Sequence, residues 1–283
     1  MEAATQLPNP APHTGLLRDE NTILRRLFGY SDNDATHLVP DFLGIKLLQK
    51  TTLSDVRFLS IDIDSLQEKD RVIQQLHIGV SLLDTKNLQS SILGSPTAKP
   101  EAQMIDSHHF VVGSPKFSRK KSNKFLFGQF KAMSLADLRA RLAAMTLHRN
   151  IILICHGGDR ELKVLRQIDL DLHPICIIDT VKAAQHPLQL SYRYSLEKLL
   201  EEFEISFCHL HTAGNDAHFI LRALLMITVR DAELQSDPLV LPPWLPVLRA
   251  IAHAPCPSPS QPAVPVLAKD KIAKESLKTE SDY

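Results

Sequence analysis

Four residues in this sequence have the types and spacing that acid–base or metal chemistry requires. Asp62 and Asp64 stand two positions apart in an apolar stretch, so a β-strand would direct both carboxylates to one face of a sheet. Paired carboxylates repel each other unless a cation offsets them, and oxygen ligands of this kind suit Mg²⁺ or Mn²⁺. His211 and Asp216 lie at the start of a long helical pattern, where they would supply a base and a further carboxylate.

A further pair of acids follows the apolar run IILIC, residues 151–155, in the turn that continues as HGGDREL. Ligands of open α/β sheets collect at the carboxyl ends of strands, where this turn would lie. Asp159 and Glu161 are both available there. Each also has a structural interpretation, Asp159 as a helix N-cap and Glu161 as a first-turn acid. In the same way, Asp62 and Asp64 could be solvated aspartates at a strand end, and His211 could be a partly buried histidine that bonds a backbone group.

Zinc is an alternative for the segment around His211. Cys208, His209, His211 and His218 are all potential zinc ligands. In an extended segment His209 and His211 share a face while Cys208 points away from it, and the sequence has no second cysteine pair. The spacing therefore does not favour zinc.

The composition limits the classes of function. The 283 residues carry a formal net charge of +0, so a nucleic acid or membrane partner would need a local patch rather than a global field. No run approaches the roughly 18–20 apolar residues of a membrane helix, and the N-terminus lacks the pattern of a signal peptide. The four scattered cysteines indicate a reducing, intracellular compartment, cytoplasmic or nuclear.

The apolar pattern predicts an α/β fold. Residues 56–63, 76–83 and 105–112 are expected to form a three-stranded antiparallel meander, and residues 86–104 a loop. Residues 151–155 and 175–178 read as two buried parallel strands, joined by right-handed crossover helices. Helices are expected from Leu16 to Phe28, after Ser134, after Ser195 and after Thr212. The prediction is a mixed five-stranded sheet with helices on both faces.

Three regions follow from the composition along the chain. Residues 1–50 are expected to be an N-terminal extension with short helices, partly disordered, and residues 51–235 the main domain. Residues 236–283 are rich in proline and then charged, and we expect most of this tail to be disordered. The segment around Trp244 is apolar enough to dock on the core or on a protein partner.

Several motifs together resemble the DEDDh class of 3′–5′ exonucleases, which belongs to the ribonuclease H-like superfamily. They are the Asp-x-acid strand, the second strand ending IGVSLLDT, the strand–His–turn–helix unit, and the final His-x₄-Asp at a helix start. LHTAGNDAHFILRALL (residues 210–225), SLEKLL (195–200) and KFLFG (124–128) are similar to the fungal Gfd-type branch of that class. The resemblance covers about residues 56–232, and the third motif is its most specific part.

The resemblance assigns metal-binding roles to Asp62, Asp64, Glu161 and Asp216, and the role of general base to His211. The family's second-motif aspartate stands five residues after its histidine, a position that Glu161 rather than Asp159 occupies here. Two positions depart from the family pattern: Asp64 stands where glutamate is common, and Glu161 where aspartate is common. Each exchange moves a carboxylate by about 1.5 Å, while active sites tolerate roughly 0.5 Å of looseness.

The resemblance implies hydrolysis of phosphodiester bonds by two Mg²⁺ or Mn²⁺ ions, acting on the 3′ end of single-stranded RNA or DNA. A basic segment would help to hold the strand, with Phe117 and Phe125 available for stacking. Its cations are Lys116, Arg119, Lys120, Lys121 and Lys124. The same segment also reads as a solvated basic loop. Two other functions stay open: a catalytically weakened adaptor that binds nucleic acid or a protein of RNA metabolism, and a zinc hydrolase unrelated to nucleic acid.

Overall fold

A six-stranded mixed sheet organises the protein, in the strand order β4-β3-β2-β1-β5-β6. The computed structural model describes residues 15–30, 45–69, 72–113, 122–235 and 240–257. The strands are β1 (Arg57–Lys69), β2 (Val72–Asp84), β3 (Asp106–Gly113), β4 (Lys131–Met133), β5 (Ile151–Cys155) and β6 (Cys176–Asp179). β1, β2 and β3 pair antiparallel, while β5 is parallel to β1, β6 to β5 and β4 to β3. The predicted meander and the two parallel strands are therefore confirmed, and β4 is an additional sixth strand. The expectation that residues 175–178 are buried was wrong, because β6 lies at the edge of the sheet and leaves Ile175 and Ile177 exposed.

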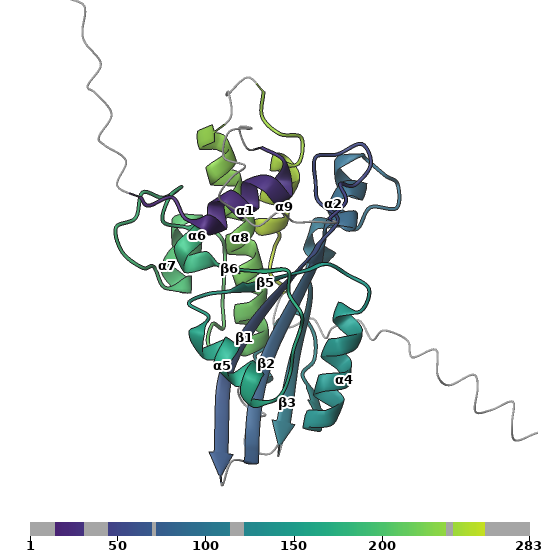
Figure 1. Ribbon diagram of the computed structural model, residues 1–283, viewed down its shortest axis with the longest axis vertical. Coiled ribbons are helices and arrows are strands. Elements are labelled where there is room, and N and C mark those ends of the chain that lie inside the picture. The colour runs from purple at the N-terminus through teal and green to yellow at the C-terminus, as the bar shows by residue number, and fades with distance from the viewer. Residues whose placement is uncertain (1–14, 31–44, 70–71, 114–121, 236–239, 258–283) are drawn as a thin grey trace, which may run out of the picture.

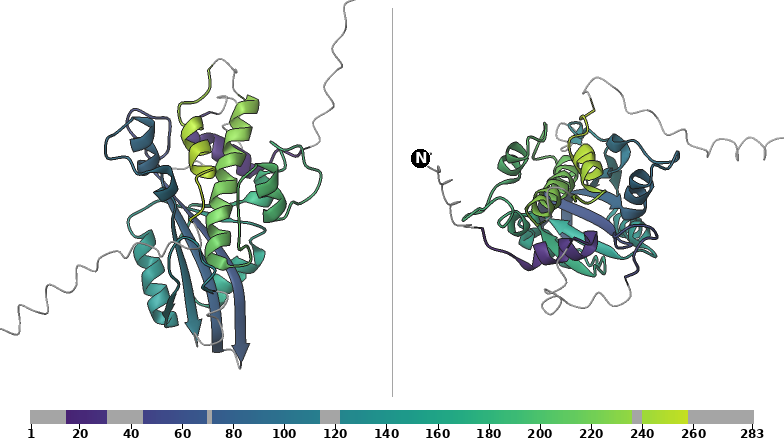
Figure 2. Two further views of the ribbon diagram at one scale, coloured as in Figure 1. Left: turned by 180° about the vertical axis from the view of Figure 1, so that it is seen from behind. Right: turned by 90° about the horizontal axis from the view of Figure 1, so that it is seen from above.

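Helices cover both faces of this sheet, as Figures 1 and 2 show. Those on one face are α4 (Leu135–Thr146) and α5 (Asp159–Gln167). The other face carries α8 (Ala213–Gln235), with α1 (Asp19–Phe28), α6 (Thr180–Ala183), α7 (Leu196–Glu202) and α9 (Leu245–Ala252) around it. This arrangement is consistent with the ribonuclease H-like fold that the sequence predicted.

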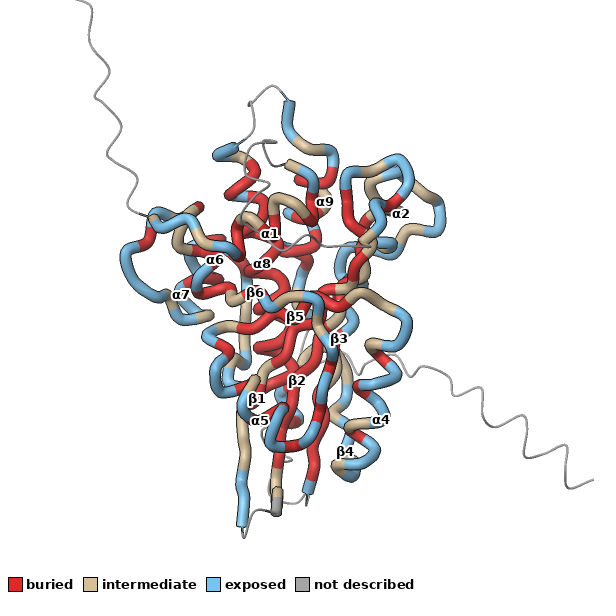
Figure 3. Tube along the Cα trace, in the orientation of Figure 1, coloured by how far each residue is buried: buried red, intermediate tan, exposed pale blue. Residues whose placement is uncertain are grey.

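Two hydrophobic cores follow from the alternation of side chains along β1. Leu59 and Ile61 pack with α4 and α5, whereas Phe58 packs on the opposite side with α8. The α8 side holds the larger core, and Figure 3 shows the buried stretch running along α8 and the centre of the sheet. Helix α8 is buried on nearly every side, so its apolar residues are not confined to one stripe, and polar side chains such as Arg222 and Asp231 are buried among them.

The expected helix starts are confirmed at Ser134 and Ser195. The side chain of Ser134 accepts a hydrogen bond from the backbone N–H of Asp137, and that of Ser195 from the N–H of Lys198. Such caps satisfy backbone donors that the helix leaves unpaired, and each is worth about 1 kcal/mol. The N-terminal helix, α1, is also present within the predicted range.

The expectation that residues 86–104 form a loop was wrong. Helix α2 (Thr85–Ile92) begins there, and a short 3₁₀ helix, η2, covers Glu101–Gln103. Asp84, at the end of β2, caps α2 by accepting from the N–H of Lys86. The buried side chain of Leu88 fastens α2 to the core, so a helix forms even though few of its residues are apolar.

The segment around Trp244 docks on the protein's own core. The Trp244 ring is buried beside Phe28 and Tyr30, and its indole N–H donates to the carbonyl oxygen of Phe28, at 3.0 Å. Helix α9, which follows, packs against α8. Residues 240–257 therefore belong to the folded body, beyond the boundary expected at residue 235. Among the described residues, no helix is long and apolar enough to cross a membrane.

Candidate active site

Strand β1 carries the first two candidate acids at the centre of the sheet. Asp62 lies on the α8 side, because it alternates with Ile61 and Ile63, which pack on the opposite face. The pairing register of β1 with β2 shifts between Ile63 and Ser65, so Asp64 sits in a β-bulge. A bulge re-aims the side chain that it carries. The sequence predicted that Asp62 and Asp64 point to the same face of the sheet by regular alternation. The bulge interrupts that alternation between Ile63 and Ser65.

A close backbone approach brings the start of α8 to this part of the sheet. Asp62 pairs with Gly79 of β2, and a Cβ at position 79 would overlap the carbonyl group of Ala213. Only glycine leaves room for the helix to come this near. On the neighbouring strand, Nδ1 of His109 accepts a hydrogen bond from the backbone N–H of Gly214, at 3.2 Å. β2 and β3 thus fix the helix start beside Asp62.

His211 and Asp216 are joined directly at that helix start. The backbone N–H of His211 donates to Oδ1 of Asp216, at 3.2 Å. The backbone of His211 is left-handed, with φ of 62°, a conformation that costs a non-glycine residue about 1–2 kcal/mol. Asp216 is nearly buried, whereas His211 is exposed to solvent. The pair therefore places one inward carboxylate and one accessible imidazole at the same turn.

The turn after β5 directs Glu161, rather than Asp159, into the protein. Glu161 is buried and Asp159 is exposed, although both lie in the first turn of α5. Asp179, at the end of β6, holds this turn: its Oδ1 accepts from the N–H of Gly157, at 2.9 Å, and caps α6. Burial raises the pKa of the Glu161 carboxyl group, and the charge of Asp179 raises it further.

The four acids meet electrostatically at Asp62. Burial raises the pKa of Asp62 well above its usual range, and the neighbouring carboxylates of Asp216, Glu161 and Asp64 raise it further. Arg160 opposes them, since its guanidinium lowers the pKa of both Asp62 and Glu161. Negative charge from β1, α5 and α8 is therefore concentrated around one half-buried carboxylate.

The donor chemistry of this site suits a hard divalent cation, although the side chains do not form a ready cage. Among the residues that the structure describes, no group of three or more His, Cys, Asp or Glu side chains is arranged to hold a metal ion. Three carboxyl groups act on Asp62 electrostatically, and carboxylate oxygen is the ligand type of Mg²⁺ and Mn²⁺. Without a cation the carboxylates repel each other, which explains why they do not converge on one point. Their ligand type nevertheless fits Mg²⁺ or Mn²⁺.

The zinc alternative loses one of its four ligands. The His218 ring is fully buried, with Nδ1 2.8 Å from Oγ of Ser107 and Nε2 accepting from Nε of Arg222. It also stacks on Phe127, at 3.5 Å between ring centroids. Burial and the charge of Arg222 lower its pKa well below the usual value, so it is a neutral core residue. It is not available to a metal at the surface.

The KFLFG segment, residues 124–128, packs on the start of α8 through Asn215. The Asn215 side chain accepts from the N–H of Leu126 and donates to the carbonyl oxygens of Lys124 and His209. Phe125 is buried against Gly214 and His109. The expectation that Phe125 stacks on a nucleic acid is therefore wrong, because its ring supports the helix start instead.

Most of the basic segment lies outside the described residues. Lys116, Phe117, Arg119, Lys120 and Lys121 are in this group, so their predicted contact with nucleic acid is not addressed by the structure. Lys124 is described, and it is exposed.

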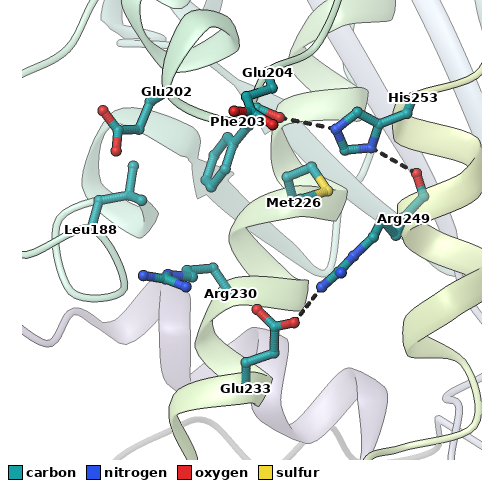
Figure 4. A pocket seen from close by; sticks show the side chains of 9 residues that line it. All are labelled: Leu188, Glu202, Phe203, Glu204, Met226, Arg230, Glu233, Arg249 and His253. Carbon is teal, nitrogen blue, oxygen red and sulfur yellow. Dashed lines mark hydrogen bonds and ion pairs between the residues drawn. The ribbon is translucent and has the colours of Figure 1, made fainter.

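A separate cleft of about 500 Å³ lies between α7, α8 and α9 (Figure 4). An ion pair between Arg249 and Glu233 crosses it, and Met226 lies on its α8 wall. Met226 follows Asp216 by ten residues, which is roughly 15 Å along a helix. This cleft is therefore distinct from the acidic site.

Sequence reasoning missed three residues that build the site: Asp179, His109 and Gly79. The sequence did contain a signal for Asp179. This acid ends the apolar run of β6, which is parallel to β5, and the carboxyl ends of parallel strands meet at one edge of a sheet. No local signal marks His109 and Gly79, whose partners on α8 are more than a hundred residues away.

Comparison with known families identifies a family that matches this chain. Residues 57–227 match the DEDDh family described as DNA polymerase III subunit epsilon-like, C-terminal domain. The match spans more than half of the chain, from the start of β1 into α8, and contains all four acids and His211. Comparison with curated proteins finds none that matches the chain.

Proposed function

The chain belongs to the DEDDh family of DNA polymerase III subunit epsilon-like domains, and we propose that it is a divalent-metal-dependent 3′–5′ exonuclease. Its substrate would be the 3′ end of single-stranded RNA or DNA in an intracellular compartment. The observation that carries the proposal is the interaction of Asp62 with Asp216, Glu161 and Asp64. Like charges brought this close raise each other's pKa values, and such clusters are common at functional sites, where a bound cation offsets them.

Two Mg²⁺ or Mn²⁺ ions would be held by Asp62, Asp64, Glu161 and Asp216. When bound, such ions offset the negative charge that builds up on the phosphate and on the departing 3′ oxygen. Arg160 is the nearby cation of the chain itself, and it would help to attract the phosphate into a site that otherwise repels it.

His211 would take the proton of the attacking water. Its imidazole is exposed, and histidine is the side chain that most often takes a proton in general base catalysis. The hydrogen bond from its backbone to Asp216 ties the turn that carries the base to one carboxylate. The resulting hydroxide-like oxygen would attack the terminal phosphodiester and release a 5′-mononucleotide.

Within the family, we propose that the chain belongs to the fungal Gfd-type branch. The segments that carry this likeness are KFLFG and LHTAGNDAHFILRALL. They are in contact, because Asn215 of the second segment bonds the backbone of Lys124 and Leu126 in the first. The two segments therefore form one structural unit, in which the KFLFG loop supports the start of α8.

Trimming of a 5′-labelled oligonucleotide with Mg²⁺ or Mn²⁺ tests the proposed activity. We expect a ladder of products shortened from the 3′ end, which Asp62→Ala and His211→Ala abolish. Asp159→Ala is the matched control, because this exposed acid precedes Glu161 by two residues and should leave the rate within about twofold. Absence of trimming with either metal, in folded wild-type protein, would refute the exonuclease.

A second candidate is a catalytically weakened adaptor that binds nucleic acid or a protein of RNA metabolism. The bulge at Asp64 and the exchanged acids at 64 and 161 favour it, because both alter where carboxylates lie. An adaptor would retain oligonucleotides without shortening them, and Asp216→Ala would leave that binding unchanged. The two functions therefore give opposite results in the trimming assay.

A further inference from the structure

An exposed aromatic and basic loop lies beside the turn that carries Glu161. It consists of Tyr192, Arg193 and Tyr194, between α6 and α7. Tyr192 is 55% exposed, a large fraction for an aromatic side chain, and Arg193 is also exposed. The two tyrosine rings lie 5.3 Å apart, tilted by 56°. Packing on the core does not account for the exposed ring of Tyr192, so the loop presents a face to solvent.

The loop is anchored to the acidic site through His156. Nδ1 of His156 lies 2.9 Å from Oγ1 of Thr180, and the same imidazole bonds the backbone of Tyr194. His156 begins the turn that leads to Arg160 and Glu161. Tyr194 also packs partly against the core on the α8 side. The loop is therefore held near the carboxyl end of β5.

Two guanidinium groups accompany the aromatic rings. Arg193 lies between the tyrosines in sequence, and Arg160 lies next to Glu161 and lowers the pKa of Asp62. Among the described residues, no ion pair or hydrogen bond engages the Arg193 side chain, whereas Arg160 interacts electrostatically with Asp62 and Glu161. Exposed cations without an acidic partner can take phosphate groups, and aromatic faces beside them can take bases.

We propose that Tyr192, Arg193 and Tyr194 form a binding site for single-stranded nucleic acid, on which a base stacks and a phosphate pairs with Arg193. The inference rests on the proposed function, because the strand bound by the loop would be the one whose 3′ end enters the acidic site. Stacking on tyrosine tolerates any base, so the site would set the grip on the strand rather than its sequence.

Fluorescence anisotropy of the full chain with a labelled oligothymidylate, in EDTA to prevent turnover, tests this site. Tyr192→Ala should weaken binding by about 5- to 150-fold, the range that one stacked base supplies. Tyr192→Phe keeps the ring and should bind within about twofold of wild type. Both changes lie on an exposed side chain, so an unchanged melting temperature should verify folding.

Salt dependence gives a separate readout for Arg193. Arg193→Ala should reduce the slope of log K against log salt by about 0.7, the contribution of one phosphate contact on a single strand. Arg230→Ala is the matched control: this exposed arginine lies near the far end of α8 and should change neither slope nor affinity.

The outcomes separate this inference from the exonuclease proposal. Trimming by wild type, with unchanged binding in Tyr192→Ala and Arg193→Ala, would overturn the loop site alone. The exposed tyrosines would then be candidates for contact with a protein partner. Weakened binding in these variants, with no trimming by wild type, would support the loop site and refute the exonuclease. Absence of oligonucleotide binding by wild type would overturn the site.

Discussion

Nδ1 of His109 accepts the backbone hydrogen bond of Gly214, so a strand of the sheet caps the first turn of the helix that carries Asp216. The first N–H groups of a helix have no partner inside it, and an imidazole from β3 satisfies one of them here. Nδ1 must therefore be the unprotonated nitrogen, and Nε2 carries the proton towards Oγ of Ser122, at 3.4 Å. The position of α8 thus depends on a neutral histidine outside the helix.

Replacing His109 by phenylalanine should lower both stability and activity. Phenylalanine keeps a ring of similar size but leaves the Gly214 N–H buried without an acceptor, which costs about 1–3 kcal/mol. A shift of the helix start by about 1 Å would reduce kcat/KM by roughly 100-fold. Urea unfolding and oligonucleotide trimming measure the two effects. His109→Asn restores an acceptor and should recover part of both, whereas equal losses in the two variants would contradict a capping role.

Gly79→Ala should displace the start of α8 from the sheet. The added methyl group would overlap the carbonyl of Ala213, directly opposite Asp62, and overpacking of this kind costs about 1–3 kcal/mol. Trimming activity should fall with the stability, because Asp216 moves away from Asp62. Gly94→Ala is the control: nothing lies near a Cβ there, and only its left-handed backbone adds a cost of about 1–2 kcal/mol. Full activity in Gly79→Ala would exclude the close approach.

The elements that the sequence predicted correctly are those whose pattern is local. Alternation marks β1, and the unbroken apolar run marks β5 as a strand buried on both faces. Strand β4 was missed because its three residues are too few to show a period. Helix α2 was missed because its cap, Asp84, and its one buried leucine were read as the end of a strand and part of a loop.

The site was predictable only as far as residue types and spacing reach. The acids could be named from the sequence, but the bulge at Asp64 depends on pairing with β2. Likewise, the burial of Glu161 and the exposure of Asp159 follow from how α5 lies on the sheet. Residues such as His109 act through contacts between distant segments, and a single sequence does not display such contacts.

His218 should make stability fall below about pH 6.5. An unfolded histidine binds a proton near that pH. Burial, and then the charge of Arg222, hold the folded pKa well below it. As pH drops through 6.5 the unfolded state takes up a proton that the folded state does not, so stability is complete above this pH and decreases below it. The slope approaches about 1.4 kcal/mol per pH unit.

Urea unfolding between about pH 7.5 and pH 5 measures this slope. His218→Gln cannot take up the proton, so its stability should change less over that range than that of wild type. His173→Gln is the control, since its side chain is 86% exposed and its loss should leave the slope unchanged. Parallel curves for wild type and His218→Gln would show that His218 titrates normally in the fold.

Asp62→Asn should make the metal-free protein more stable while it removes activity. Burial and three neighbouring carboxylates raise the folded pKa of Asp62 above its unfolded value of about 3.9. The folded state therefore holds the proton more tightly, and stability is lost as pH rises through the folded pKa. Above the unfolded pKa the Asp62 carboxyl group therefore opposes folding, and asparagine has a similar shape without an ionisable group.

Mg²⁺ should reverse this order by binding the wild-type site. A ligand that binds only the folded state adds about 2.7 kcal/mol at a concentration 100 times its Kd. Thermal unfolding with EDTA and with Mg²⁺ should thus show a large metal-dependent gain for wild type and for Asp159→Asn, but a small one for Asp62→Asn. A metal response equal in all three proteins would place the cation elsewhere. Lower stability of metal-free Asp62→Asn than of wild type would show that the Asp62 carboxylate is already compensated by the chain itself.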